Sequence, residues 1–291
     1  MSFFDKNPWT ILTKIEKGIK DRIEERGIKL KNWEICVNYG IKTGLNKAFI
    51  INEELRAKLI NEDPKCAEII RPILRGKDIR KYGYSFSNLY LICTFPSLKI
   101  DIEKYPSIEQ YLKSFGIKKL EQSGKRYFEN GVEIQSRKKT NNKWFETQDS
   151  INYWDDFSKP KIIYPDISSD FNFAYDEKGF FLNNTSYFIT GDKRTLLYLF
   201  GVLNSKVIGW FYKLISVQLG SRAVRMFSQY VLTIPIPKVD QDTENEMVLL
   251  SSKLINDSKN NEILGKKINE LVFKIFNFSN EEVAFFEKLA S

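Results

Sequence analysis

Residues 187–214 (YFITGDKRTLLYLFGVLNSKVIGWFYKL) place a short strand directly before the clearest helix of this 291-residue chain. Tyr187–Thr190 is rich in aromatic and β-branched residues, which predicts a strand. Lys193–Leu214 is long, strongly apolar and free of proline, which predicts a helix. The fold class then depends on which elements surround this strand and helix.

On either side of this stretch the chain changes irregularly between short strands and helices. Further strands are predicted at Glu34–Val37, Ala48–Ile51, Leu89–Phe95, Lys161–Tyr164, Phe171–Tyr175 and Val231–Ile234. Further helices are predicted at Glu53–Ile60, Cys66–Leu74 and Ile108–Leu120. The order is neither a regular β–α–β alternation nor a run of hairpins, so we expect an α+β fold with a mixed sheet.

Both ends of the chain are predicted to be helical. Ile11, Ile15, Ile19 and Ile23 recur every fourth residue and Gly27 follows as a stop, which predicts an N-terminal helix. After Pro235–Pro237, capping boxes at Thr243…Glu246 and Ser279…Glu282 begin two helices. A helix between them carries an apolar stripe of Leu264, Ile268, Leu271, Val272 and Ile275. We therefore divide the chain into a connector helix (1–30), a central domain (31–238) and a helical tail (239–291). The tail stripe is expected to pack on its own domain or on a partner subunit.

The composition limits the function classes. The formal net charge is +8 and the pI is about 9.1, which favours a polyanionic partner. The chain has no histidine, which excludes His-based catalytic triads, imidazole metal ligands and HNH-type nucleases. No cysteine pair has metal-ligand spacing, so no metal site is predicted. No residue of this chain is predicted to be catalytic. Without a signal peptide or a membrane-spanning apolar run, we expect a cytoplasmic protein.

Four basic segments are candidates for contacts with nucleic acid. The loop from Gly40 to Lys47 brackets Lys and Thr between glycines, although an ordinary hairpin turn is an equal alternative. A basic cluster surrounds Gly76, and a long basic loop lies between Ser123 and Ser150, which a solvated surface would also explain. The fourth segment follows the long helix. The predicted DNA-binding residues are Lys42, Thr43, Asn46, Lys47, Arg75, Lys77, Arg137, Lys138, Lys139, Lys143, Trp144, Arg222 and Arg225. We expect all four segments to meet in one positively charged cleft.

Two patterns suggest catalysis but have simpler explanations. Asp166, following Pro165, and Asp176-Glu177-Lys178 match the order of a PD-(D/E)xK nuclease, in which carboxylates hold a metal. The second part also has the composition of a hairpin turn, which we favour. Asn7-Pro8-Trp9 is similar to the Asn-Pro-Pro-aromatic loop of amino-methyltransferases, but it lacks the second proline and no glycine-rich cofactor loop follows. We interpret it as the start of a helix.

Several segments together resemble the TaqI-like C-terminal specificity domain of N6-adenine DNA methyltransferases and type IIG restriction–modification enzymes. They are Asn38–Ile50, Glu68–Ile79, Trp154–Pro165, Leu203–Ser205, Ile234–Pro237 and the tail Ile268–Glu282, in the order expected for that family. The resemblance covers nearly the whole chain. In the family, the catalytic domain with its cofactor loop lies N-terminal to this region, and both of its motifs are absent here.

The resemblance implies a target-recognition domain that reads duplex DNA for a restriction–modification enzyme. It would present an adenine to a methyltransferase or endonuclease module that is fused in the parent protein or supplied in trans. S-adenosylmethionine and Mg²⁺ are then expected only in the parent enzyme, and this chain alone is not expected to be an enzyme. The alternatives are a PD-(D/E)xK-like nuclease and a half-length specificity subunit of a type I system.

Overall fold

The computed structural model describes residues 12–219 and 223–289, which form two compact units. The first unit comprises Met1–Cys36, Asp166–Phe173 and Gly191–Ser291, and the second comprises Val37–Pro165 and Ala174–Thr190. These bounds differ from the predicted division at residues 30 and 238. The N-terminal helix, the long helical stretch and the tail belong to one unit because their apolar faces pack against one another.

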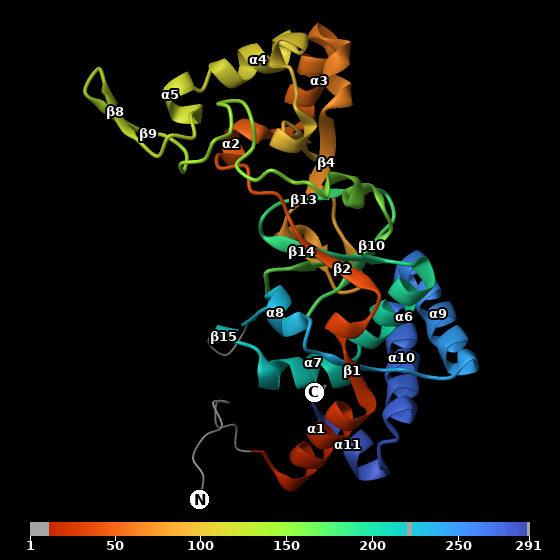
Figure 1. Cartoon of the computed structure of the whole chain (residues 1–291). Helices are drawn as coiled ribbons and strands as arrows, with labels where there is room; N and C mark the ends of the chain where they lie inside the picture. Colours follow the sequence, from red (N-terminus) through yellow and green to blue (C-terminus); the bar gives the residue numbers. More distant parts are fainter. Residues whose placement is uncertain (1–11, 220–222, 290–291) are drawn as a thin grey trace, which may run out of the picture. The chain divides into compact units, whose positions relative to one another are not determined.

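The second unit contains two four-stranded sheets (Figure 1). In the first sheet, β10 (Lys161–Pro165) pairs antiparallel with β12 (Ala174–Asp176) and β14 (Ser186–Gly191), and β2 (Ile35–Tyr39) lies next to β14. In the second, β7 (Leu89–Ile92) pairs antiparallel with β3 (Ile50–Asn52) and β4 (Ile70–Leu74), whereas β13 (Phe181–Leu182) is parallel to β4. The predicted α+β class with a mixed sheet is therefore confirmed.

Short helices and two small hairpins complete the second unit. The helices are α2 (Asn46–Phe49), α3 (Glu53–Glu62), α4 (Pro106–Lys113) and α5 (Ile117–Leu120). The hairpins are β5 (Ile79–Arg80) with β6 (Gly83–Tyr84), and β8 (Arg126–Glu129) with β9 (Val132–Gln135). A continuous hydrophobic core joins the helices to the second sheet through fully buried residues such as Phe49, Leu74 and Ile108.

The helix predicted at Cys66–Leu74 and the strand predicted at Val231–Ile234 are both wrong, and the strand predicted at Ala48–Ile51 is helical (α2) as far as Phe49. Cys66–Leu74 is a 3-10 turn (Pro64–Glu68) followed by β4, because Pro72 would break a helix there. Val231–Ile234 is not a strand: α8 (Ser228–Val231) ends there, and the strand is β17 (Pro235–Pro237). Both prolines of β17 are accommodated because the strand pairs only with β1 (Gly27–Lys29), in a two-stranded sheet.

The first unit is mainly helical. It contains α1 (Lys14–Arg26), α6 (Lys193–Leu203), α7 (Lys206–Ile215), α9 (Gln241–Asn256), α10 (Asn261–Phe276) and α11 (Asn280–Lys288). A small antiparallel sheet adds β11 (Ile167–Ser168), β15 (Gln218–Leu219) and β16 (Ala223–Arg225). The single helix predicted at 193–214 is two helices, because the Ser205 side chain accepts a hydrogen bond from the Ile208 amide and starts α7.

The helical tail packs within its own chain. Leu264, Ile268, Leu271 and Val272 are buried, Ile275 is half-buried, and α10 contacts α1, α6, α7 and α9. Of the two alternatives for the stripe, the structure therefore shows packing on the chain itself. The capping box at Ser279 is confirmed, whereas Asp240 rather than Thr243 caps α9. No helix in the described part of the chain combines the length and the apolar character needed to cross a membrane.

Candidate nucleic-acid interface

The loop from Gly40 to Lys47 presents three polar side chains to solvent. Lys42, Asn46 and Lys47 are exposed. Thr43 is fully buried, because its hydroxyl donates to Asn46 Oδ1 (2.7 Å) and accepts from the Leu45 amide (3.1 Å). The prediction that Thr43 contacts DNA is therefore corrected, since this residue fixes the loop. The loop is also not a hairpin turn, because β2 and β3 belong to different sheets.

Arg137 is buried and holds the long basic loop against the Gly40–Lys47 loop. Its guanidinium donates to four backbone carbonyls: Leu120 (2.7 Å), Thr43 (2.9 Å), Glu146 (2.8 Å) and Trp144 (2.6 Å). Burial lowers the pKa of Arg137 to about 10, although the nearby Glu146 carboxylate opposes this shift. Because the side chain is only 4% exposed, the prediction that Arg137 contacts DNA is corrected as well.

The residues that follow Arg137 remain on the surface. Lys138, Lys139 and Lys143 are exposed. Trp144 is half-buried and packs edge-on against Phe145, with ring centroids 5.6 Å apart, at the margin of the core. The lysines can therefore reach a phosphate, whereas Trp144 is partly occupied by its packing against the core.

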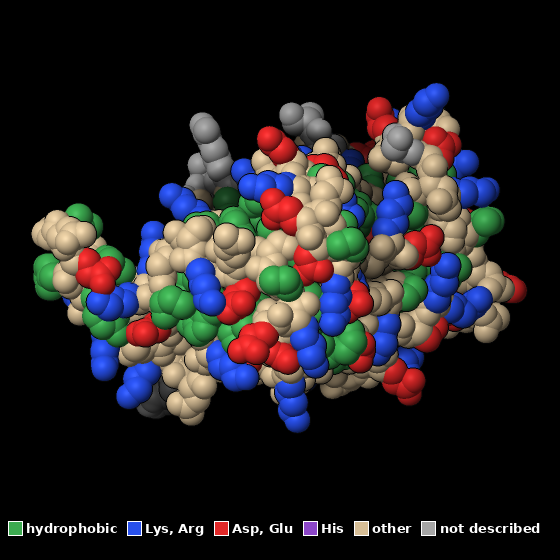
Figure 2. All heavy atoms as spheres, turned by 90° about the horizontal axis from the view of Figure 1, so that it is seen from above, with side chains coloured by type: hydrophobic (Ala, Val, Ile, Leu, Met, Phe, Trp, Pro, Cys, Tyr) green, Lys and Arg blue, Asp and Glu red, His purple; other side chains and the backbone are tan. Residues whose placement is uncertain are grey.

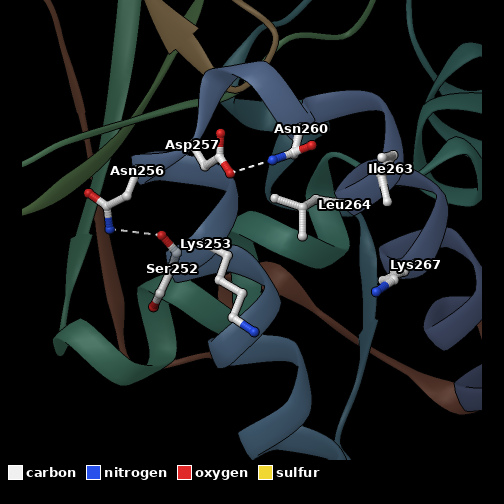
Figure 3. Close-up of a pocket in the computed structure, with 8 residues that line it drawn as sticks. All are labelled: Ser252, Lys253, Asn256, Asp257, Asn260, Ile263, Leu264 and Lys267. Atoms are coloured by element: carbon white, nitrogen blue, oxygen red, sulfur yellow. Dashed lines mark hydrogen bonds between the residues drawn. The ribbon is translucent and has the colours of Figure 1, made fainter.

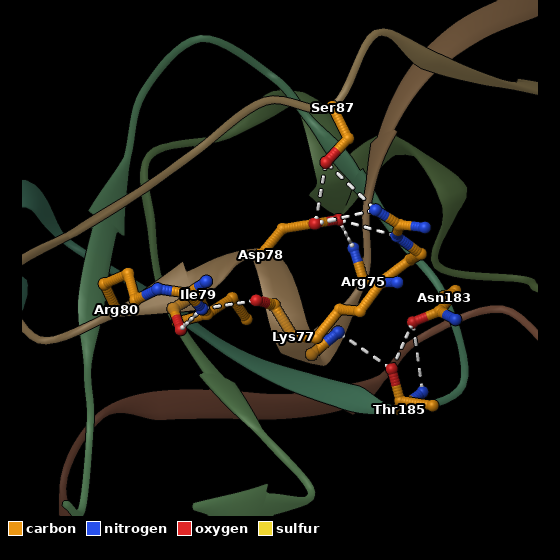
Figure 4. Close-up of polar contacts among 9 residues, drawn as sticks. Arg75, Lys77, Asp78, Ile79, Arg80, Ser87, Asn183 and Thr185 are labelled. Carbon is orange, nitrogen blue, oxygen red and sulfur yellow. Dashed lines mark hydrogen bonds and ion pairs between the residues drawn. The ribbon is translucent and has the colours of Figure 1, made fainter. Parts of the chain in front are cut away.

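Arg75 and Lys77, on either side of Gly76, differ in their partners (Figure 4). Arg75 donates through Nε and Nη2 to both carboxylate oxygens of Asp78, each at 2.9 Å, and Ser87 bonds to the same pair. Burial would raise the pKa of Asp78, but hydrogen bonds from Arg75 and Ser87 outweigh it and lower the pKa. Lys77, in contrast, is exposed.

Residues 183–185 connect the Gly40–Lys47 loop to the turn around Gly76 within the second unit. Gly76 N donates to Thr185 Oγ1 (2.8 Å), and Ile41 pairs with Asn183 in an isolated bridge of the same turn. The Cβ of any other residue at Gly40 would lie 1.9 Å from the Asn183 carbonyl oxygen, so the chains meet too closely for a side chain. The Gly40–Lys47 loop therefore contacts both the long basic loop and the turn that holds Gly76.

The fourth predicted segment belongs to the first unit. Arg222 lies outside the described residues. Arg225 is half-buried; it forms an ion pair with Asp166 (Nη1 to Oδ2, 2.8 Å) and lies over the Phe227 ring. Convergence of all four segments on one cleft stays a prediction, because it concerns both units.

The geometry argues against the nuclease alternative. Asp176 is fully buried and accepts from Lys161 Nζ (2.5 Å), Tyr84 Oη (2.9 Å) and the amides of Lys178 and Phe180 (3.0 Å each). Burial lowers the pKa of Lys161, and the Asp176 carboxylate opposes this shift. Asp176 is thus part of a satisfied structural network with no position left for a metal. The hairpin turn predicted at residues 176–179 is wrong: the chain bends at Lys178, but the following strand β13 pairs with β4 and not with β12.

A groove between α9 and α10 has a volume of about 560 Å³ (Figure 3). Its polar groups are bonded to one another: Asn260 donates to Asp257 (2.6 Å) and Asn256 donates to the Ser252 carbonyl (2.9 Å). Among the described residues no group of three His, Cys, Asp or Glu side chains could hold a metal ion. We assign no function to this groove.

The β8–β9 hairpin was not predicted from the sequence. Its signal was the dipeptide Asn130-Gly131 between two short runs, and both residues have positive φ (50° and 77°), as a two-residue type I′ turn requires. Ser136 and Gly124 close the base through backbone bonds to Lys125 and Arg137. The hairpin projects from the helices of the second unit (Figure 1).

Residues 71–236 match the family described as the TaqI-like C-terminal specificity domain, which is more than half of the chain. The chain belongs to this family. This specificity domain is 23% identical over 278 residues to the type II methyltransferase M.PaeR7I of Pseudomonas aeruginosa, covering 94% of this chain and 44% of that protein. It is 23% identical over 272 residues to the type II methyltransferase M.BanIII of Aneurinibacillus aneurinilyticus, covering 88% of this chain and 44% of that protein. The chain therefore spans less than half the length of these curated relatives.

Two solved structures share the fold of the specificity domain. The type IIL restriction–modification enzyme MmeI, solved in complex with DNA, superposes with a TM-score of 0.58 at 13% identity, over 89% of this chain and 35% of that one. The type IIG restriction endonuclease BpuSI gives a TM-score of 0.52 at 12% identity, over 90% of this chain and 33% of that one. The resemblance noted in the sequence is confirmed by the family match.

Proposed function

We propose that this chain recognises a specific duplex DNA sequence and presents an adenine to a methyltransferase module outside this segment. The observation that carries the proposal is membership of the TaqI-like specificity family across residues 71–236. The curated relatives are type II methyltransferases more than twice as long as this match, which leaves room in them for a separate catalytic part. That module is fused to this chain or binds it as a separate subunit.

The exposed lysines among the predicted DNA-binding residues of the second unit supply the contacts to phosphates. They are Lys42, Lys47, Lys77, Lys138, Lys139 and Lys143. None of them takes part in an ion pair with another described residue. A lysine without a carboxylate partner can neutralise a phosphate at no cost in broken ion pairs, and each such contact steepens the salt dependence of binding.

The proposal is tested by selecting DNA from a random duplex library and measuring the dissociation constant of the selected duplex at several salt concentrations. Lys139→Met should weaken binding to every sequence and reduce the slope of log K against log salt by about one. Lys58→Met is the matched control, because Lys58 is exposed but pairs with Glu62 at 3.9 Å. If the unmodified chain selects no sequence and binds no DNA even at low salt, the proposed function is wrong.

Cofactor chemistry is assigned to the catalytic modules. We propose that S-adenosylmethionine and Mg²⁺ act only there, because this sequence lacks the cofactor and target-amine loops of methyltransferases. Isothermal titration of this chain with S-adenosylmethionine should give no binding heat. Micromolar binding would contradict this assignment.

A further inference from the structure

The β8–β9 hairpin has two faces with different surroundings. Cross-strand partners share a face, and the register pairs Arg126 with Gln135 and Phe128 with Glu133. The opposite face carries Tyr127 and Ile134, which are half-buried, near the base. We call the face of Arg126, Phe128, Glu133 and Gln135 the outer face, since all four residues are exposed.

Exposure of an aromatic side chain on this face has no folding explanation. Phe128 is 76% exposed, the highest value among the large hydrophobic residues described as exposed. Burying such a ring in the core would contribute roughly 1.5–3 kcal/mol to stability, which this position forgoes. Hydrophobic side chains lie on the surface of the hairpin at the left of Figure 2, next to charged ones. Aromatic residues are enriched in interfaces, so an exposed ring on a projecting element is available for contact with a partner.

Arg126 is held in place by weak, exposed interactions. Its Nε donates to Gln135 Oε1 (3.0 Å), and its Nη1 lies 3.2 Å from Glu133 Oε1. The Arg126 side chain is 70% exposed and that of Glu133 is 45% exposed. Exposed pairs of this kind contribute little to stability. The guanidinium is therefore extended along the outer face and can exchange these partners for a ligand.

The base of the hairpin, in contrast, is fixed to the core. Tyr127 Oη donates to Glu121 (2.7 Å), Ser136 Oγ donates to the Lys125 carbonyl (2.8 Å), and Arg137 N donates to the Glu121 carbonyl (2.9 Å). The buried Arg137 guanidinium then ties the strand that leaves the hairpin to four carbonyls. The outer face is thus presented from a firm base.

We propose that the β8–β9 hairpin enters the major groove of the target duplex and that Arg126 and Phe128 read base edges there. This rests on the proposed function. The major groove admits a two-stranded ribbon; arginine binds guanine O6 and N7 with two bonds, and phenylalanine contacts the thymine methyl group. Glu133 and Gln135 orient the Arg126 guanidinium until a base replaces them.

The charge around the hairpin favours DNA over a protein partner. Residues 117–147 contain eight Lys or Arg residues and four Glu residues. Lys119, Lys125, Lys138 and Lys139 are exposed near its base, and a Cβ added at Gly124 would lie 3.3 Å from Lys139 Cβ. A ribbon with a reading face and a lysine-rich base matches the division of a duplex into base edges and flanking phosphates.

The test uses the duplex selected by the unmodified chain from a random library, and the same duplex with deoxyuridine replacing one thymidine at a time. At one position, loss of the thymine methyl should weaken binding of the unmodified chain by about fourfold, the value of one buried methyl group. Phe128→Ala should weaken binding similarly and no longer respond to that replacement. Arg126→Ala, used in a new selection, should relax the preference for one guanine by about tenfold. Val132→Ala is the control, since Val132 is also exposed (63%) but on the opposite face.

The outcomes separate this inference from the proposed function. If the unmodified chain selects a site, and folded Phe128→Ala and Arg126→Ala variants bind it with unchanged affinity and sequence preference, the hairpin does not read bases. Equal weakening on all sequences would also overturn the inference, because it indicates phosphate contact alone. Light scattering that shows a dimer lost in Phe128→Ala would assign the outer face to a second copy of the chain. If no DNA is bound at all, the proposed function itself fails.

Discussion

At the scale of single residues, Arg137 and Lys139 lie two positions apart and have opposite roles. Arg137→Met removes four charge-assisted hydrogen bonds; the Glu146 carbonyl keeps a bond from Gln122 Nε2 (3.0 Å), whereas the carbonyls of Leu120, Thr43 and Trp144 lose the Arg137 donor. Because such bonds contribute about 1.5–3 kcal/mol each, we expect the free energy of unfolding to fall by at least about 3 kcal/mol. Urea denaturation followed by circular dichroism measures this loss.

Lys139→Met is the matched control for that measurement. An exposed residue without a described partner should change the free energy of unfolding by no more than about 0.5 kcal/mol in either direction. If Arg137→Met were equally mild, Arg137 would not anchor the loop, and its original assignment as a DNA contact would have to be reconsidered.

Asp78 gives the second unit a defined pH dependence. Hydrogen bonds from Arg75 and Ser87 outweigh burial and lower its folded-state pKa, so its contribution is present at neutral pH and is lost as the pH falls below about 5. Asp78→Asn should reduce the free energy of unfolding at pH 7, and this difference should shrink at pH 3. Asp101→Asn, at an exposed carboxylate, should change little at either pH. A constant difference between pH 7 and pH 3 would contradict the role of the charge.

The sequence identified the basic segments but not the direction of each side chain. Lys138 and Lys139 are exposed, as the predicted contact with DNA requires, whereas Arg137 and Thr43 are buried. The partners of Arg137 come from separate segments: Leu120 lies 17 residues and Thr43 lies 94 residues before it in the sequence. Only the folded chain brings these carbonyls together, so local composition could not distinguish an anchoring arginine from a reading one.

At the scale of elements, two helical glycines predict opposite effects of the same substitution. A Cβ at Gly201 in α6 would lie 2.4 Å from Met247 Sδ and 2.6 Å from Ser251 Oγ in α9, and both of those residues are fully buried. Gly201→Ala should therefore destabilise the chain by about 1–3 kcal/mol through overpacking. At Gly209 in α7 the nearest atom is Phe171 Cδ1 at 3.7 Å, so Gly209→Ala should stabilise it by about 0.5–1 kcal/mol.

Thermal unfolding of both variants tests this pair. The midpoint should fall for Gly201→Ala and rise for Gly209→Ala. If both rose, the contact between α6 and α9 would be looser than the structure indicates. If both fell, helix propensity would not determine the effect at Gly209.

The elements that the sequence predicted well are those that local chemistry determines. The Ser279 capping box and the apolar stripe of α10 depend on residues three or four positions apart. The errors at Cys66–Leu74 and Val231–Ile234 came from short apolar runs, for which helix and strand periodicities are hard to distinguish. The strand β4 is stabilised by pairing with β7 and with β13, and β13 (Phe181–Leu182) lies far away in the sequence.

At the scale of the whole molecule, the helical tail is part of the first unit and cannot be removed without exposing its core. Deleting residues 239–291 would uncover the faces of α6 and α7 that contact α9 and α10. We expect the truncated chain to aggregate and to bind a hydrophobic dye, since each uncovered large side chain represents about 1.5–3 kcal/mol. A soluble truncated chain with an unchanged melting temperature would show that the tail is dispensable.

The passage of the chain between its two units has a consequence for the order in which they form during synthesis. The chain enters the second unit after residue 36 and leaves it for the last time after residue 190, whereas α6, α7 and α9–α11 of the first unit come later. Every residue of the second unit has therefore been translated before most of the first unit exists. Domains generally fold as units while they emerge from the ribosome. The lysine-bearing loops and the hairpin can therefore fold before the helices that cover Ile19 and Ile23 of α1 have been synthesised.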